Sequence, residues 1–129
     1  MMLKSSVILA ILLFVPAFIN AQGGKAEPKH IEFQKGKSSV MLSGGLSNGS
    51  EMEYVFAAKK GQKVTIKNTK TSLFDFRVFN QEFDFETEFE SSAELTFEIP
   101  ETGSYFLFVR KKQVATPRTA RFSLALTIK

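Results

Sequence analysis

Five acidic side chains stand at every second position of one short segment and form the densest group of potential ion ligands in the chain. They are Glu82, Asp84, Glu86, Glu88 and Glu90. Residues two apart on a strand project from the same face, so this spacing predicts an acidic stripe with phenylalanines on the opposite face. We interpret the stripe first as a solvated face that prevents edge-to-edge pairing. Contact with a cationic protein and weak Ca²⁺ binding are the alternatives.

No metal site and no cofactor are predicted. Ca²⁺ takes several oxygen ligands at about 2.3–2.6 Å from one ion, whereas side chains along a straight strand diverge. The chain also lacks an Asp-x-Asp-x-Asp-Gly loop. Zinc prefers histidine and cysteine ligands, and the sequence holds one histidine, His30, and no cysteine.

Catalytic groups are scarce for the same reason. One histidine and no cysteine leave no convincing Ser-His-Asp or Cys-His set. Two carboxylates on one strand face lie near the separation that glycoside hydrolases use, about 5–9.5 Å. A working acid also needs an apolar pocket that raises its pKa, and five exposed acids single out none. We therefore expect a binding protein and not an enzyme.

Basic residues gather in two clusters. One surrounds a central turn and comprises Lys59, Lys60, Lys63 and Lys67, and the other lies near the end of the chain and comprises Arg110, Lys111, Lys112, Arg118 and Arg121. Both can be solvated rims. The second cluster brackets the segment 113–117, and loops on a rigid β scaffold often carry recognition. The formal net charge of +4 is too modest to indicate nucleic acid as a partner.

The N-terminal segment predicts export. Lys4 precedes an apolar run over 7–19 that contains Pro16, and small residues follow at 20–22. This pattern is typical of a secretory signal peptide cleaved after Ala21, and the run is too short for a membrane span. We expect a signal peptide over 1–21, a flexible lead-in over 22–29, and one domain over 30–129 in the periplasm or secreted. No membrane span is expected after cleavage.

Turn chemistry recurs about every ten residues, which is typical of an antiparallel sandwich or barrel. The predicted strands are 30–34, 38–46, 51–58, 63–67, 73–79, 82–89, 94–99, 105–112 and 119–128. Fourteen phenylalanines and no tryptophan predict an aromatic core, with a base-stacking platform as the rival interpretation. The core candidates are Phe74, Phe76, Phe83, Phe85, Phe89, Phe97, Phe106, Phe108 and Phe122. The predicted fold is all-β, a single-domain antiparallel β-sandwich of about eight strands.

Several landmarks of this domain occur in the same order in a known family. They are Phe33-x-Lys35-Gly36-x-Ser38-Ser39, Ser43-Gly44, Tyr54-x-Phe56-x-Ala58-Lys59-Lys60-Gly61-Gln62-Lys63-Val64, Pro100-x-Thr102-Gly103-x-Tyr105, Val109 and the closing strand 122–129. From His30 to Lys129 the chain resembles the periplasmic inhibitors of goose-type (g-type) lysozyme. Gly61-Gln62 and 102–105 also occur in pre-peptidase C-terminal domains. A pre-peptidase-like carbohydrate- or surface-binding module with no lysozyme target is therefore the alternative.

The resemblance implies a sandwich that inserts loops from one end into the substrate cleft of a goose-type lysozyme. The implied contact loops are 46–50, 101–104 and 111–116. The implied partner-binding residues are Asn48, Gly49, Ser50, Thr102, Ser104, Lys111, Lys112 and Arg118. The chain departs from the family pattern in two loops. Gly49 stands where the family has an aromatic residue, and Lys111 and Ala115-Thr116 stand where the third loop of the family has arginines.

Overall fold

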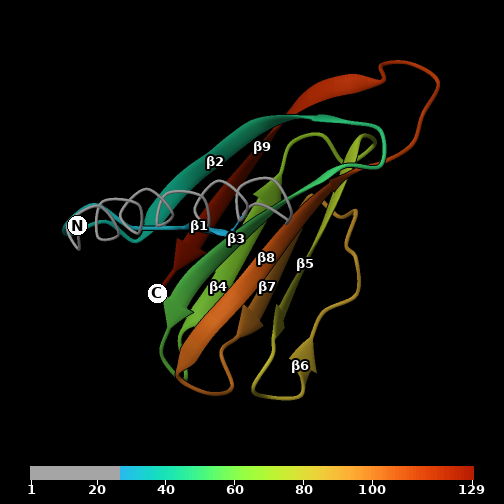
Figure 1. Ribbon diagram of the computed structural model, residues 1–129. Helices are drawn as coiled ribbons and strands as arrows, with labels where there is room; N and C mark the ends of the chain where they lie inside the picture. The colour runs from blue at the N-terminus through green and yellow to red at the C-terminus, as the bar shows by residue number, and fades with distance from the viewer. Residues whose placement is uncertain (1–26) are drawn as a thin grey trace, which may run out of the picture.

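The computed structural model describes residues 27–129, which form nine β-strands and no helix (Figure 1). The strands are β1 (Lys29–His30), β2 (Ser39–Ser47), β3 (Glu51–Ala58), β4 (Lys63–Asn68), β5 (Phe74–Asn80), β6 (Phe85–Glu86), β7 (Glu94–Glu98), β8 (Gly103–Lys111) and β9 (Thr119–Ile128). The predicted all-β sandwich is confirmed. The predicted signal peptide lies outside the described residues. Over 27–129 no helix long and apolar enough to cross a membrane is found.

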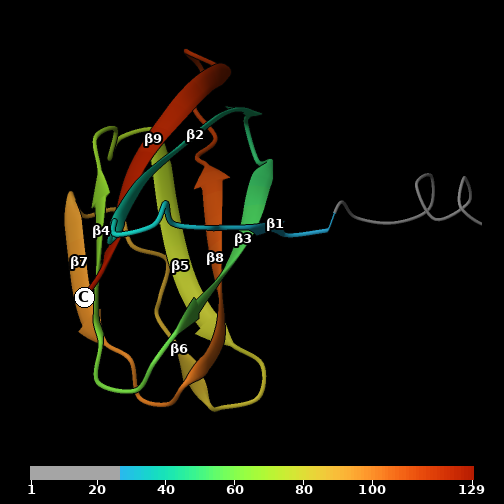
Figure 2. The ribbon, with the colours of Figure 1, turned by 90° about the vertical axis from the view of Figure 1, so that its left-hand side faces the viewer.

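Two sheets pack face to face within the described domain (Figure 2). The five-stranded sheet has the order β1-β3-β8-β5-β6, and the four-stranded sheet has the order β2-β9-β4-β7. Every strand pair is antiparallel except β1 with β3. All connections except β5–β6 pass from one sheet to the other. The connecting segments therefore gather at the two ends of the sandwich, where they can form surfaces for recognition.

Alternation along each strand fills the core between the sheets. On β9, Phe122, Leu124, Leu126 and Ile128 are buried, while the residues between them face outward. Phe122 contacts the rings of Phe74 at 5.8 Å and Tyr54 at 6.4 Å, both edge-on. Such aromatic pairs each add about 0.5–1.5 kcal/mol beyond the burial of apolar area. The predicted inward face of the last strand is thus confirmed.

Not every predicted core phenylalanine lies between the sheets. On β8 the inward positions are held by Tyr105, Leu107 and Val109, so Phe106 and Phe108 face outward. They meet Phe79 of β5 there, with ring centroids 5.2 and 5.0 Å away. Phe89 also lies on this outer face, against Arg110, so the prediction of a core role for Phe89, Phe106 and Phe108 is wrong. The sequence of β8 is apolar on both faces, so alternation cannot tell the inner face from the outer one.

The predicted strand over 82–89 is also wrong for most of its length. Only Phe85–Glu86 forms a strand, because the side chain of Asn80 closes a turn just before it. Asn80 Oδ1 accepts hydrogen bonds from the backbone N–H groups of Glu82 (2.6 Å) and Phe83 (2.7 Å). Beyond Glu86 the chain stays beside β5 only through isolated contacts, at Thr87 and Glu90, before it crosses to the other sheet. The acidic residues therefore do not form one stripe on a continuous strand.

Candidate binding loops

Two connections meet at one end of the sandwich: the β2–β3 turn over 48–50 and the β8–β9 loop over 112–118 (Figure 1). Three backbone hydrogen bonds join these segments. Asn48 N–H donates to the carbonyl of Arg118 (2.9 Å), Gly49 N–H donates to that of Lys111 (3.0 Å), and Lys111 N–H donates to that of Ser50 (3.0 Å). The turn and the loop thus form one connected surface, as two of the three contact loops implied by the sequence resemblance require.

Lys111 does not project as a free cation. Its exposed fraction is 0%, because it follows Tyr105, Leu107 and Val109 on the inward face of β8. Its ammonium donates to Asn48 Oδ1 (2.8 Å) and to the backbone carbonyl of Lys112 (2.9 Å). A buried charge must be compensated by such hydrogen bonds. The expectation that Lys111 contacts a partner directly is corrected: in this structure it supports the loops from within.

Asn48 connects the same two loops through its side chain. While its Oδ1 accepts from Lys111, its Nδ2 donates to the carbonyl of Val114 (2.7 Å). We call Asn48 and Lys111 together the loop bridge. Gly49 follows with φ of +78°, a conformation that favours glycine. A Cβ at Gly49 would lie 3.3 Å from Gln113 Nε2, the end of an exposed side chain, so the backbone conformation is the stronger requirement for glycine here.

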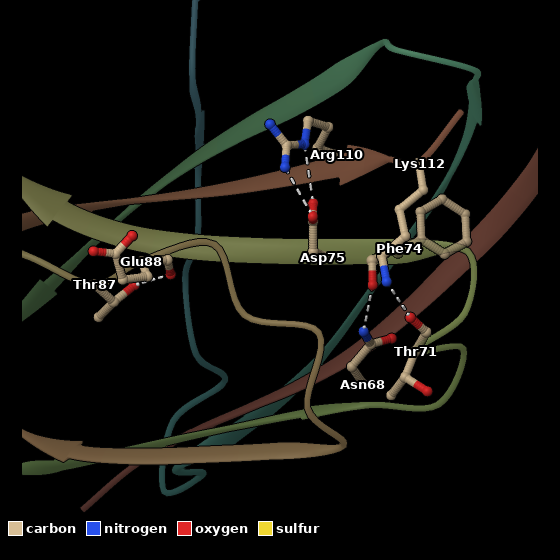
Figure 3. Close-up of polar contacts among 8 residues, drawn as sticks. All are labelled: Asn68, Thr71, Phe74, Asp75, Thr87, Glu88, Arg110 and Lys112. Atoms are coloured by element: carbon tan, nitrogen blue, oxygen red, sulfur yellow. Dashed lines mark hydrogen bonds and ion pairs between the residues drawn. The ribbon is translucent and has the colours of Figure 1, made fainter. Parts of the chain in front are cut away.

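A third connection, over 69–73 between β4 and β5, completes this end (Figure 3). Lys112 reaches it through its N–H, which donates to the carbonyl of Leu73 (2.8 Å), and through its ammonium, which donates to that of Thr71 (2.9 Å). Asn68 Nδ2 donates to the carbonyl of Phe74 (3.0 Å) and fixes the far side of the connection. The segments 48–50, 112–118 and 69–73 are together named the loop end.

Much of the loop end is exposed. Arg118 is exposed, and within residues 27–129 it forms no ion pair. Lys112 and Ser50 are partly exposed, and Gln113, Ala115 and Thr116 are exposed. A hollow of about 490 Å³ lies beside them, lined in part by Gly49, Lys112 and Gln113. Of the three cations predicted as partner contacts, Lys111, Lys112 and Arg118, only Arg118 is exposed, and it has no charged partner in the described domain.

The remaining two predicted residues lie elsewhere. Thr102 precedes β8 and Ser104 lies at its start, whereas the loop end follows its last residue, Lys111. Nine extended residues span about 27 Å, so the two places are at opposite ends of the sandwich. Thr102 Oγ1 accepts a hydrogen bond from Lys60 N–H (2.9 Å) in the β3–β4 turn. The structure therefore does not bring the 101–104 segment together with the other two predicted loops.

Arg110, at the edge of the loop end, is held by a carboxylate. Its Nε and Nη2 donate to Asp75 at 3.1 and 2.9 Å (Figure 3), and its guanidinium lies 3.6 Å from the centroid of Phe89. The hydrogen bonds to Asp75 raise the pKa of Arg110 above its ordinary value. This pairing was not predicted from the sequence. The signal for it was the alternation on β5 and β8, which places Asp75 and Arg110 directly across from each other.

His30 is exposed at the end of β1, beside β3. Over residues 27–129 no three His, Cys, Asp or Glu side chains gather closely enough to hold a metal ion. The geometry of the loop end is that of a rigid protruding surface, which can dock against another molecule.

No protein-family model and no curated protein sequence matches the chain. Solved structures do. The periplasmic inhibitors of g-type lysozyme from Escherichia coli (a mutant) and Aeromonas hydrophila each align with a TM-score of 0.65 at 25% identity. They cover 81% and 79% of this chain and 100% and 96% of their own. The inhibitor from Salmonella Typhimurium aligns with a TM-score of 0.66 at 23% identity.

The alternative suggested by the sequence also has a structural neighbour. The pre-peptidase C-terminal domain of a Bacillus anthracis collagenase aligns with a TM-score of 0.54 at 16% identity, over 84% of this chain. That likeness is one of fold alone. The resemblance to the g-type lysozyme inhibitors is confirmed: the chain is similar to them over almost their full length, with higher scores and higher identity. These neighbours are inhibitors and not enzymes.

Proposed function

We propose that this protein inhibits a g-type lysozyme by placing its loop end in the substrate cleft of that enzyme. The similarity to three inhibitors of g-type lysozyme supports the target. The observation that carries the mechanism is the loop bridge, in which Lys111 and Asn48 hold two loops in one arrangement. A loop that is already ordered loses less entropy on binding. The 101–104 segment, at the far end, takes no part in this docking.

Arg118 is the group we assign to contact with acidic residues of the cleft. It is exposed, and its own backbone carbonyl is fixed by Asn48. A guanidinium can bind a carboxylate through two parallel hydrogen bonds, which an ammonium cannot. Lys112 is tied to Thr71 and serves mainly to position the loop.

Inhibition assays with purified lysozymes test this proposal. The parent protein should slow a g-type lysozyme and leave a chicken-type lysozyme unaffected. Arg118→Ala should weaken inhibition by about tenfold or more, because a hydrogen bond to a charged group contributes about 1.5–3 kcal/mol.

Lys63→Ala is the matched control, since it removes one exposed cation from β4 and should inhibit as the parent does. Thr102→Ala should also match the parent. If the parent inhibits no g-type lysozyme, the proposed target is wrong. If Thr102→Ala weakens inhibition and Arg118→Ala does not, the target stands and the loop end is the wrong surface.

We also infer export to the periplasm or medium, because the sequence begins with a pattern typical of a signal peptide and the neighbours are periplasmic inhibitors. Mass spectrometry of the exported protein should find a chain that begins at or near Gln22. A chain that retains Met1 in that fraction would contradict cleavage.

A further inference from the structure

A second hollow lies at the opposite end of the sandwich from the loop end. Its volume is about 530 Å³, within the range of about 300–1,000 Å³ that small-molecule sites occupy. Its walls come from the ends of β3 and β9, the start of β8, and the segment 33–38 that leads into β2. None of the proposed lysozyme contacts of the loop end lines it.

The hollow exists because the paired ends of β3 and β8 carry small residues. Ala57 pairs with Ser104 and Ala58 pairs with Gly103, whereas the next pair inward, Phe56 with Tyr105, is fully packed with stacked rings 5.9 Å apart. Phe33 and Ile128 provide further apolar wall. The floor is therefore apolar, and an alkyl or aromatic group placed there would be removed from water.

The rim of the hollow is cationic. Lys37 and Lys59 line it, both are exposed, and neither forms an ion pair with any residue of 27–129. Ser38, Thr102 and Ser104 add hydroxyl groups. Among the described residues that line the hollow, none carries a carboxylate side chain. An apolar floor below two unpaired cations is complementary to a small molecule with a negative head and an apolar body.

We propose that this hollow binds a small amphipathic anion, an alkyl or aryl carboxylate, with its carboxylate at Lys37 and Lys59 and its apolar body against Ala57, Ala58, Phe33 and Ile128. Both parts of the ligand are required. The cations alone are solvated and attract an anion weakly. The hollow alone is open to solvent, so it removes only part of an apolar ligand from water. This site is independent of lysozyme inhibition, because it lies about one strand length, roughly 27 Å, from the loop end.

Titration of the exported protein with octanoate tests this site, followed by calorimetry and by amide chemical shifts. Octanoate should bind and shift the amides of Ala58 and Gly103 while leaving that of Gly49 unchanged. Octanol, which lacks the charge, and acetate, which lacks the apolar body, should each bind about tenfold more weakly or worse. Equal binding of octanol and octanoate would overturn the role of the lysines, and with it the proposal.

Two variants locate the site. Lys37→Gln with Lys59→Gln should weaken octanoate binding by about tenfold, whereas Lys63→Gln with Lys67→Gln, which removes the same charge from β4, should not. Ala57→Phe adds a ring at an exposed lining position and should abolish binding without lowering the melting temperature. Equal losses in the two lysine pairs, full binding by Ala57→Phe, or no octanoate binding by the parent at millimolar concentration would each refute the proposal.

Discussion

At the residue scale, the most consequential side chain is one that the sequence alone places in solvent. Lys111 is wholly buried and its ammonium is compensated by neutral oxygens of Asn48 and Lys112. Its aliphatic stem continues the apolar inner face of β8, while its head joins two loops. A lysine can fill both roles because it is apolar along most of its length.

Lys111→Met tests that role. Methionine keeps the stem but leaves two partly buried acceptors, Asn48 Oδ1 and the carbonyl of Lys112, without their donor, and the loss of such partners costs about 1–3 kcal/mol. We expect the free energy of unfolding to fall by about that amount in urea titrations. Lys112→Met, which leaves a partly exposed carbonyl unpaired, should cost less. A Lys111→Met protein as stable as the parent would mean that the ammonium contributes nothing net to the fold.

The burial of Tyr54 predicts that the free energy of unfolding falls at alkaline pH. Burial disfavours its phenolate and raises its pKa above the ordinary value. A pKa that is higher in the folded state adds stability below the unfolded pKa of about 10, and that stability is lost as pH rises through the folded value. Unfolding measured from about pH 9 to 11.5 should therefore show a steeper loss for the parent than for Tyr54→Phe. Identical pH profiles would contradict a buried phenol as the cause.

At the element scale, the segment after β6 is held beside β5 by backbone hydrogen bonds, and one aromatic ring packs it against the outer face of the five-stranded sheet. Phe89 lies under Arg110 at 3.6 Å and near Arg77 at 5.6 Å, and the backbone of Glu90 bridges to Phe76. Arg110 is itself fixed by Asp75. The ring therefore links the crossover segment to the Arg110–Asp75 ion pair.

Phe89→Ala should release this segment. A cation–π contact contributes about 0.5–2 kcal/mol, and the lost apolar burial adds to it, so the free energy of unfolding should fall by about 2–3 kcal/mol. Amide hydrogen exchange should quicken at Thr87 and Glu90 more than on β9. Phe89→Leu keeps apolar volume, so it should recover only the share of the free energy of unfolding that comes from apolar burial. If leucine restores the full stability, the guanidinium contacts are incidental.

How well the sequence predicts a strand depends on whether its apolar residues lie on one face only. The strands β3 and β9 have the predicted bounds, 51–58 and 119–128, because one face is apolar and turns close both ends. The predicted strand 82–89 fails because alternation does not reveal that the side chain of Asn80 closes a turn over its first residues. In the same way, sequence resemblance groups 101–104 with 111–116, yet the strand between them must separate them by its own length.

At the scale of the whole molecule, the two ends of the sandwich differ in construction. The loop end is cross-linked by hydrogen bonds through Lys111 and Lys112, whereas Lys37 and Lys59 beside the hollow at the other end form no ion pair with any residue of 27–129. Crossing connections make this possible, since nearly every loop must run over one end or the other. One small domain can thus present a rigid protein-binding end and a small-molecule-binding end.

The loop end also offers a gain-of-function test that rests on the proposed function. The sequence resemblance places arginine at positions where this chain has Ala115 and Thr116, and both are exposed. Ala115→Arg should strengthen inhibition of a g-type lysozyme by about tenfold, because a guanidinium can bind an acidic cleft through paired hydrogen bonds. Gly49→Tyr, which would supply the family's aromatic residue, should instead destabilise the turn, since the φ of +78° strains any side chain there.

Thr96→Arg is the matched control for Ala115→Arg, because it adds the same charge on the exposed face of β7, away from the loops. It should leave both inhibition and melting temperature close to those of the parent. If it strengthens inhibition as much as Ala115→Arg does, the gain comes from overall charge, which speeds encounter at a distance and weakens with salt. A gain that is confined to Ala115→Arg and persists at high salt would place the lysozyme contact on the 112–118 loop.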